Sequence, residues 1–194
     1  IYVGFYGRHD VYEPLVERVV TLTNELRQGD PSQDFVDVGA IIFPHQIDVA
    51  EKHIADAVAK GAHVRAGGKR KEGPGQFFEP TVITELSTKA MAMNTEPFGP
   101  LAIINPFKTF DDAVTEANRL PYGLAAYAWT RSAKTANNIA AQVETGMVTI
   151  NHLGLALPEV PFGGVKDSGL GREGLRWAIE DMTEPRIMVL AWPQ

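Results

Sequence analysis

Two short strings of this sequence hold side chains that could do chemistry. The first, Glu96–Pro100, reads EPFGP. Glu96 offers two carboxylate oxygens to the hydroxyls of a diol, and Phe98 offers a flat ring to a flat heterocycle. A ribose with its nicotinamide needs those two things. The same string also predicts a plain turn, because its prolines fix φ and its glycine permits a positive φ. Both interpretations stay open at this point.

The second string, Pro161–Arg172, reads PFGGVKDSGLGR and contains four glycines. Glycine at this density destabilises helix and strand, so the string predicts a tight loop that lets backbone approach a partner closely. It is not a dinucleotide-phosphate fingerprint, because it does not run from a strand into a long helix. A purely structural loop fits equally well. Lys166 and Arg172 are more typical of a solvated face than of a ligand clamp.

Two polar residues, Asn151 and His152, directly follow the apolar run Met147–Ile150. Parallel α/β sheets place ligands at this end of their strands. His152 could serve as a general base, but the sequence offers it no partner, so the pattern favours a loop histidine. Glu159 suits either a rim charge or a structural acceptor.

Residue types exclude several kinds of chemistry. The chain has no cysteine, which excludes disulfides and thiolate ligands. Its five histidines lack metal-ligand spacing, so we expect no metal site. A formal net charge of −6 argues against nucleic acid or an anionic membrane as partner. No signal-peptide pattern follows Ile1, and we expect a fragment or processed piece of a cytoplasmic protein.

The elements that must position these residues alternate between strand and helix. Apolar patterns predict strands over residues 1–5, 62–66, 77–84, 101–105, 124–129 and 147–150, and helices over residues 10–28, 44–61, 110–117, 132–144 and 173–181. Residues 67–76 are rich in turn formers and predict an exposed hairpin or loop. The alternation predicts an α/β fold with one open, largely parallel sheet flanked by helices. We expect a single domain over residues 1–184.

The last run of the chain, Arg186–Trp192, is apolar at nearly every position. A strand of this kind needs burial on both faces. In a monomer it would be an exposed edge prone to pairing. We therefore predict that residues 185–194 form a C-terminal oligomerisation strand that pairs with another chain.

The strings, taken in order, resemble the aldehyde dehydrogenase superfamily downstream of its catalytic cysteine. The matching pieces include FFEPTV, EPFGPL, FDDAVTEANRLPYGLAAYAWT, GMVTIN, PFGGVKDSGLGREG and the terminal RIMVL. The resemblance covers nearly the whole chain and is closest to semialdehyde dehydrogenases, especially the succinate-semialdehyde type. It implies an enzyme in which a cysteine thiolate attacks an aldehyde, hydride passes to NAD or NADP, and the thioester is hydrolysed to a carboxylic acid.

The resemblance also implies roles for five residues. Glu96 would hold the nicotinamide ribose, and Phe98 would pack near the nicotinamide ring. Asn151 would lie at the active-site end of its strand, Ala156 would face the mouth of the substrate tunnel, and Phe162 would form part of its wall. The final strand would join a sheet shared between the subunits of a homodimer or tetramer.

The chain departs from the family in two ways: it lacks several of the family's catalytic groups, and it differs at two positions that it does contain. The family's cysteine, glutamate base and cofactor loop would precede Ile1, so the resemblance assigns no catalytic residue to this chain. We expect the chain alone neither to oxidise aldehydes nor to bind a dinucleotide tightly. Thr95 stands where many members have an acidic residue, and Ala156 stands where the succinate-semialdehyde type often has a serine. The alternative, from another class, is a non-catalytic pairing or oligomerisation module derived from this family.

Overall fold

The computed structural model describes residues 4–192 and divides the chain into two compact units, Ile1–Ala113 and Val114–Gln194. Each unit has strands that pair among themselves, so each has its own small sheet or sheets. The single domain over residues 1–184 stays a prediction. The predicted limit between residues 184 and 185 stays a prediction.

The first unit is built on a four-stranded sheet with the order β1-β4-β3-β2. Its strands are β1 (Gly4–Arg8), β2 (His63–Ala66), β3 (Thr81–Thr84) and β4 (Leu101–Phe107). The strands β1, β4 and β3 are parallel, and β2 joins β3 in the antiparallel sense. This sheet confirms the predicted α/β class.

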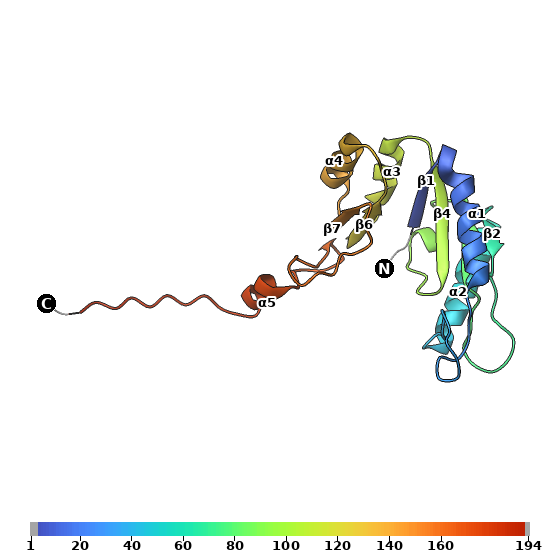
Figure 1. Ribbon diagram of the computed structural model, residues 1–194, viewed down its shortest axis with the longest axis horizontal. Helices are drawn as coiled ribbons and strands as arrows, with labels where there is room; N and C mark the ends of the chain where they lie inside the picture. Colours follow the sequence, from blue (N-terminus) through green and yellow to red (C-terminus); the bar gives the residue numbers. More distant parts are fainter. Residues whose placement is uncertain (1–3, 193–194) are drawn as a thin grey trace. The chain divides into compact units, whose positions relative to one another are not determined.

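Two helices cover opposite faces of this sheet. Val82 and Ile104 pack with Tyr12 and Val16 of α1 (His9–Glu25). Their strand neighbours Ile83 and Ile103 belong to the other core cluster, with the apolar side of α2 (Pro44–Ala59). Successive side chains of a strand point to opposite faces, so the two helices must lie on different sides. Figure 1 shows α1 running alongside β4 in this unit.

Two predicted boundaries differ from the structure for reasons of hydrogen bonding. The helix α1 ends at Glu25 rather than near Gln28, because the Arg27 carbonyl accepts from the N–H groups of Asp37 and Val38. The strand β3 begins at Thr81 rather than at Phe77. Pro80 has no N–H to give to a sheet ladder. The residues before it pair instead with residues 69–71, which forms the predicted hairpin.

The second unit carries two small two-stranded sheets. The strand β5 (Tyr122–Gly123) pairs antiparallel with β8 (Val165–Lys166), and β6 (Ala125–Ala128) pairs parallel with β7 (Met147–Ile150). The helix α4 (Ala133–Gln142) connects β6 to β7, and the Ser132 side chain caps it by accepting from the Thr135 N–H at 3.2 Å. The helix α3 (Phe110–Ala117) spans the division between the units, and α5 (Leu175–Asp181) follows the glycine-rich tract.

The predicted C-terminal strand is not formed in this structure. Residues 182–192 contain neither helix nor strand, and Ile187, Met188 and Val189 are each at least 83% exposed. A strand needs a neighbour that satisfies its backbone groups, and residues 4–192 provide none for this run. Residues 193–194, the end of the predicted strand, lie outside the described residues. Pairing with another chain stays a prediction.

No helix within residues 4–192 combines the length and the apolar character that crossing a membrane requires.

Candidate functional site

The EPFGP string forms a turn of the first unit that is fixed at both ends. Before the turn lies a short 3-10 helix, η1 (Met91–Met93), and its Met91 carbonyl accepts a hydrogen bond from the Thr95 N–H at 2.8 Å. After the turn, the Pro100 carbonyl accepts the Thr81 N–H of β3 at 2.8 Å. The start of β4 continues from there in register with β3. The turn is therefore held between a helix and the sheet.

The centre of this turn is strained. Phe98 has a φ of 38°, in the left-handed region that residues other than glycine rarely occupy. Such a conformation costs about 1–3 kcal/mol and persists only where the surroundings over-determine it. Pro97 is buried and Glu96 half-buried, whereas the Phe98 side chain is 67% exposed. Strain of this kind often gathers at binding sites, but Glu85, Asn151 and Lys166 are left-handed as well, so the strain is compatible with both the ligand interpretation and a plain turn.

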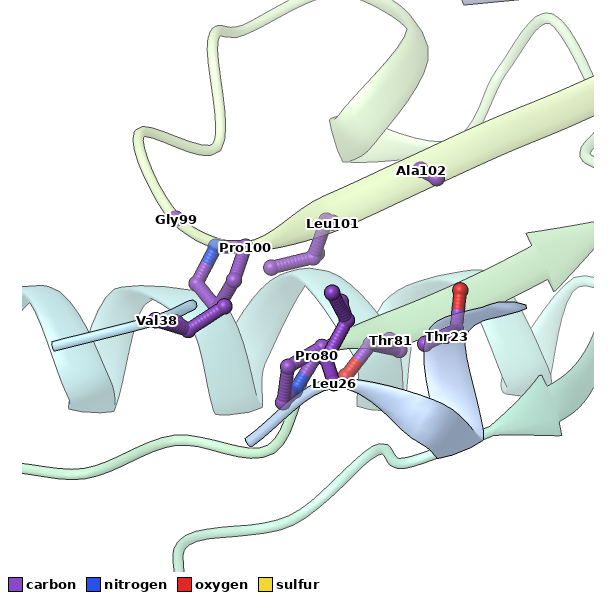
Figure 2. Close-up of a pocket in the computed structure, with 9 residues that line it drawn as sticks. All are labelled: Thr23, Leu26, Val38, Pro80, Thr81, Gly99, Pro100, Leu101 and Ala102. Atoms are coloured by element: carbon purple, nitrogen blue, oxygen red, sulfur yellow. The ribbon is translucent and has the colours of Figure 1, made fainter. Parts of the chain in front are cut away.

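A hollow of about 270 Å³ lies beside the turn but is a different feature. It is lined by Thr23, Leu26, Val38, Pro80, Thr81, Gly99, Pro100, Leu101 and Ala102. Figure 2 shows the side chains of Pro100 and Leu101 turned toward those of Leu26 and Pro80. Neither Glu96 nor Phe98 lines this hollow, and its side chains are apolar except for two threonines. It lacks the converging polar groups that orient a polar ligand.

In the second unit, Asn151 clamps the ends of β6 and β7. Its side-chain oxygen accepts from the Thr130 N–H at 2.9 Å, and its side-chain nitrogen donates to the Thr130 carbonyl at 2.8 Å. The backbone is left-handed here, with a φ of 58°, which asparagine tolerates better than most residues. The clamp accounts for an asparagine at this position without a ligand. Its predicted place at the active-site end of the strand stays a prediction.

The loop after Asn151 is exposed. The His152 Nδ1 lies 2.9 Å from the Gly154 nitrogen, whose N–H donates to it, and the ring contacts no carboxylate among the interactions of the described residues. This is the loop histidine that the pattern favoured. Ala156 and Glu159 are also exposed in this segment.

The glycine-rich tract is a braced loop. Phe162 and Glu173 exchange backbone hydrogen bonds of 3.0 and 2.7 Å, which closes the loop at its base. The Arg172 side chain then donates to the carbonyls of Gly164 and Gly171 at 2.7 and 2.6 Å. Lys166 pairs with Glu144 at 2.5 Å. The two cations thus stabilise the shape of the tract, whereas the sequence pattern favoured a solvated face for them. Phe162 is half-buried within the tract.

We expect Gly146→Ala to destabilise this unit. A Cβ added at Gly146 would lie 2.0 Å from the Gly163 carbonyl oxygen, so backbone would have to move. Overpacking of this kind costs about 1–3 kcal/mol. Urea unfolding followed by circular dichroism measures the effect. The control is Gly39→Ala, where no atom lies within 4 Å of the new methyl group. Equal unfolding midpoints for the two variants would contradict the prediction.

The five predicted site residues fall into two groups. Glu96 and Phe98 share one turn of the first unit, whereas Asn151, Ala156 and Phe162 belong to the second unit. Among residues 4–192, no group of three or more His, Asp or Glu side chains could hold a metal ion.

Sequence reasoning missed one buried polar residue that supports the turn. Asn105 on β4 accepts from the Leu86 N–H at 2.8 Å and donates to the Met93 sulfur at 3.5 Å. The signal was present in the sequence, because Asn105 ends the otherwise apolar run LAIIN. A buried amide must find partners, and here it organises the segment that leads to Glu96.

Comparisons with known proteins cover both units. Residues 5–188 match the aldehyde dehydrogenase family. Over 95% of its length, the chain is 39% identical to the 3-sulfolactaldehyde dehydrogenase of Pseudomonas putida. It is equally similar, 39% over 95%, to the succinate-semialdehyde dehydrogenase (NADP(+)) of Escherichia coli strain K12. The chain spans 38% of the length of each of these relatives.

A solved structure gives the same result for the fold. The NAD+ complex of an aldehyde dehydrogenase from Bacillus cereus superposes with a TM-score of 0.88 at 32% identity. The match covers 93% of this chain and 37% of that one. Because the family match extends over nearly all of the sequence and the fold agrees, this chain belongs to the aldehyde dehydrogenase family.

Proposed function

We propose that this chain supplies the nicotinamide-ribose contact and part of the substrate wall of an NAD(P)-dependent semialdehyde dehydrogenase. The observation that carries the proposal is the turn on which a half-buried Glu96 stands beside an exposed, strained Phe98. The reaction converts an aldehyde, water and oxidised dinucleotide into a carboxylic acid, reduced dinucleotide and a proton.

The turn fits the group that the family requires. When bound, the dinucleotide accepts a hydride at its nicotinamide ring. Glu96 would hold the nicotinamide ribose, with its carboxylate oxygens as acceptors for the ribose hydroxyls, and so would orient the ring. The exposed Phe98 ring offers a flat apolar surface that limits where the heterocycle can lie. The proposal leaves NAD and NADP both open, since one relative is named for NADP(+) and a similar structure holds NAD+.

The nucleophile must come from polypeptide outside these residues. The chain has no cysteine, and no hydroxyl of the turn or the tract is paired with a base that could activate it. We therefore infer that residues 1–194 act together with the cysteine-bearing part of a dehydrogenase. We also propose a cytoplasmic location.

The proposed substrate is a short aldehyde with an anionic group at its far end. Succinate semialdehyde carries a carboxylate there, and 3-sulfolactaldehyde carries a sulfonate, and both names belong to relatives of this chain. On the substrate side we assign Asn151 to the active-site end of β7, Ala156 to the tunnel mouth and Phe162 to the tunnel wall. The bracing of the tract by Arg172 supports the last assignment, because it fixes the backbone that carries Phe162.

The gene provides the first test of this function. We expect an open reading frame that continues upstream of Ile1 and encodes a cysteine and a glycine-rich dinucleotide loop. The full gene product, incubated with succinate semialdehyde, should form reduced dinucleotide, and propanal should be a poorer substrate. A start codon directly before Ile1, with no activity in the product, would instead support the non-catalytic pairing module.

We propose that the apolar tail completes an assembly of two or four copies. We expect deletion of residues 186–194 to lower the oligomeric state, because the apolar side chains of this run are exposed in the single chain. Each Å² of apolar surface that pairing buries contributes about 25 cal/mol. Light scattering at micromolar concentration measures the mass.

A point variant distinguishes pairing through strand hydrogen bonds from non-specific apolar association of the tail. Val189→Pro keeps apolar surface but removes an N–H that a sheet ladder needs. It should weaken the assembly as the deletion does. An unchanged mass for the deleted chain would show that the tail is not the interface.

A further inference from the structure

Asp56 on α2 makes a contact that the proposed reaction does not use directly. Its carboxylate accepts from the Met91 N–H at 2.6 Å, across 35 residues of sequence. Lys60, one turn further along α2, forms an ion pair with the same carboxylate. The side chain is only 22% exposed. The Lys60 ammonium and then the Met91 N–H lower the pKa of Asp56, so the carboxylate stays ionised at neutral pH.

Met91 transmits this restraint toward the turn. While its N–H donates to Asp56, its carbonyl oxygen accepts from the N–H groups of Asn94 and Thr95 at 3.0 and 2.8 Å. Thr95 directly precedes Glu96. A continuous path of hydrogen bonds therefore leads from a fixed carboxylate on a helix to the residue before the ribose-binding side chain.

A second anchor holds the same segment from the sheet. Asn105 of β4 bonds the Leu86 N–H, the Leu86 carbonyl and the Met93 sulfur. The segment between β3 and the turn is thus fixed to α2 at one point and to β4 at another. Two such anchors provide the over-determination that the left-handed backbone of Phe98 requires.

We propose that Asp56 is a positioning residue for the turn Glu96–Pro100. Its carboxylate fixes η1 and, through Met91, the placement of Glu96 and Phe98 against the nicotinamide ribose. This role rests on the function proposed above, because it acts through Glu96. A residue of α2 would thus help to position the cofactor, although α2 carries no residue of the turn.

Amide hydrogen exchange of the 194-residue chain tests the structural half of the proposal without any cofactor. In Asp56→Ala, the backbone of residues 91–101 should exchange about tenfold faster, since the segment loses its helix anchor. Asp56→Asn keeps an acceptor oxygen and should restore most of the protection. The matched control is Asp48→Ala on the same helix, whose carboxylate pairs with Arg70 at 2.7 Å and should leave residues 91–101 unchanged.

Kinetics of the full gene product test the functional half. Asp56→Ala should raise the KM for the dinucleotide about tenfold and leave the aldehyde KM unchanged, because misplacing a positioned group weakens one contact. In a Glu96→Gln background the same change should have little further effect, since both act on one contact. Asp48→Ala should change neither KM.

Each result decides the proposal. Faster exchange at residues 91–101 together with a raised dinucleotide KM supports it. The proposal is overturned if residues 91–101 exchange no faster in Asp56→Ala than in Asp48→Ala. It is also overturned if they exchange faster in Asp56→Ala but the KM for the dinucleotide is unchanged. Failure of the proposed function is seen separately, as a Glu96→Gln variant that transfers hydride at the normal rate.

Discussion

Glu96→Gln in the full gene product should slow hydride transfer roughly ten- to a hundredfold. The Gln amide can still accept one hydrogen bond from the ribose, but it loses the charge that strengthens the pair of bonds. A hydrogen bond to a charged group contributes about 1.5–3 kcal/mol, and each 1.4 kcal/mol is about tenfold in rate. The half-buried position of Glu96 limits how far water can replace the lost interaction.

Single-turnover absorbance of the reduced dinucleotide measures this step without interference from product release. The matched control is Glu72→Gln, an exposed carboxylate in the hairpin of residues 69–79. It should transfer hydride at the normal rate. If Glu96→Gln stays within twofold of the unchanged protein, Glu96 is a turn residue and the cofactor assignment is wrong.

The 194-residue chain by itself should show no dinucleotide-dependent aldehyde oxidation, the largest loss that we expect. The reaction needs a nucleophile that forms a covalent adduct before hydride can leave, and the chain has no cysteine. The preparation must be verified by mass, with the full gene product as the positive control in the same assay. Measurable turnover by the pure chain would mean that another residue acts as the nucleophile.

The strands and helices of the sheet regions were predictable because their apolar patterns are strong. The run LAIIN predicted the core of β4, and Met147–Ile150 coincides with β7. The apolar stripe of Ile47, Ala50, Ile54, Ala57 and Val58 predicted the buried face of α2, and all but Val58, which is 49% exposed, are buried. Here burial and local propensity favour the same structure, so the sequence pattern is sufficient.

The features that sequence reasoning missed depend on long-range contacts. The strand at Arg186–Trp192 was predicted from apolar composition alone, but a strand also needs a partner, which is absent from the described chain. The 3-10 helix η1 is fixed by Asp56 and Asn105, which lie far from it in sequence. Arg172 was expected on a solvated face, whereas it braces the loop that contains it. The turn itself was predictable in position, but its strained Phe98 was not.

The order of strands in the first sheet has a consequence for how the protein is made. The neighbour of β1 is β4, and Tyr12 on α1 donates to the Ile104 carbonyl across 92 residues of sequence. Ribosomes add about 5–20 residues per second, so this partner emerges roughly 5–20 seconds after α1. During that interval the apolar side of α1 lacks the central strand β4 of the sheet that covers it. Nascent chains that stall before Leu101 should therefore expose this apolar side and be prone to aggregation.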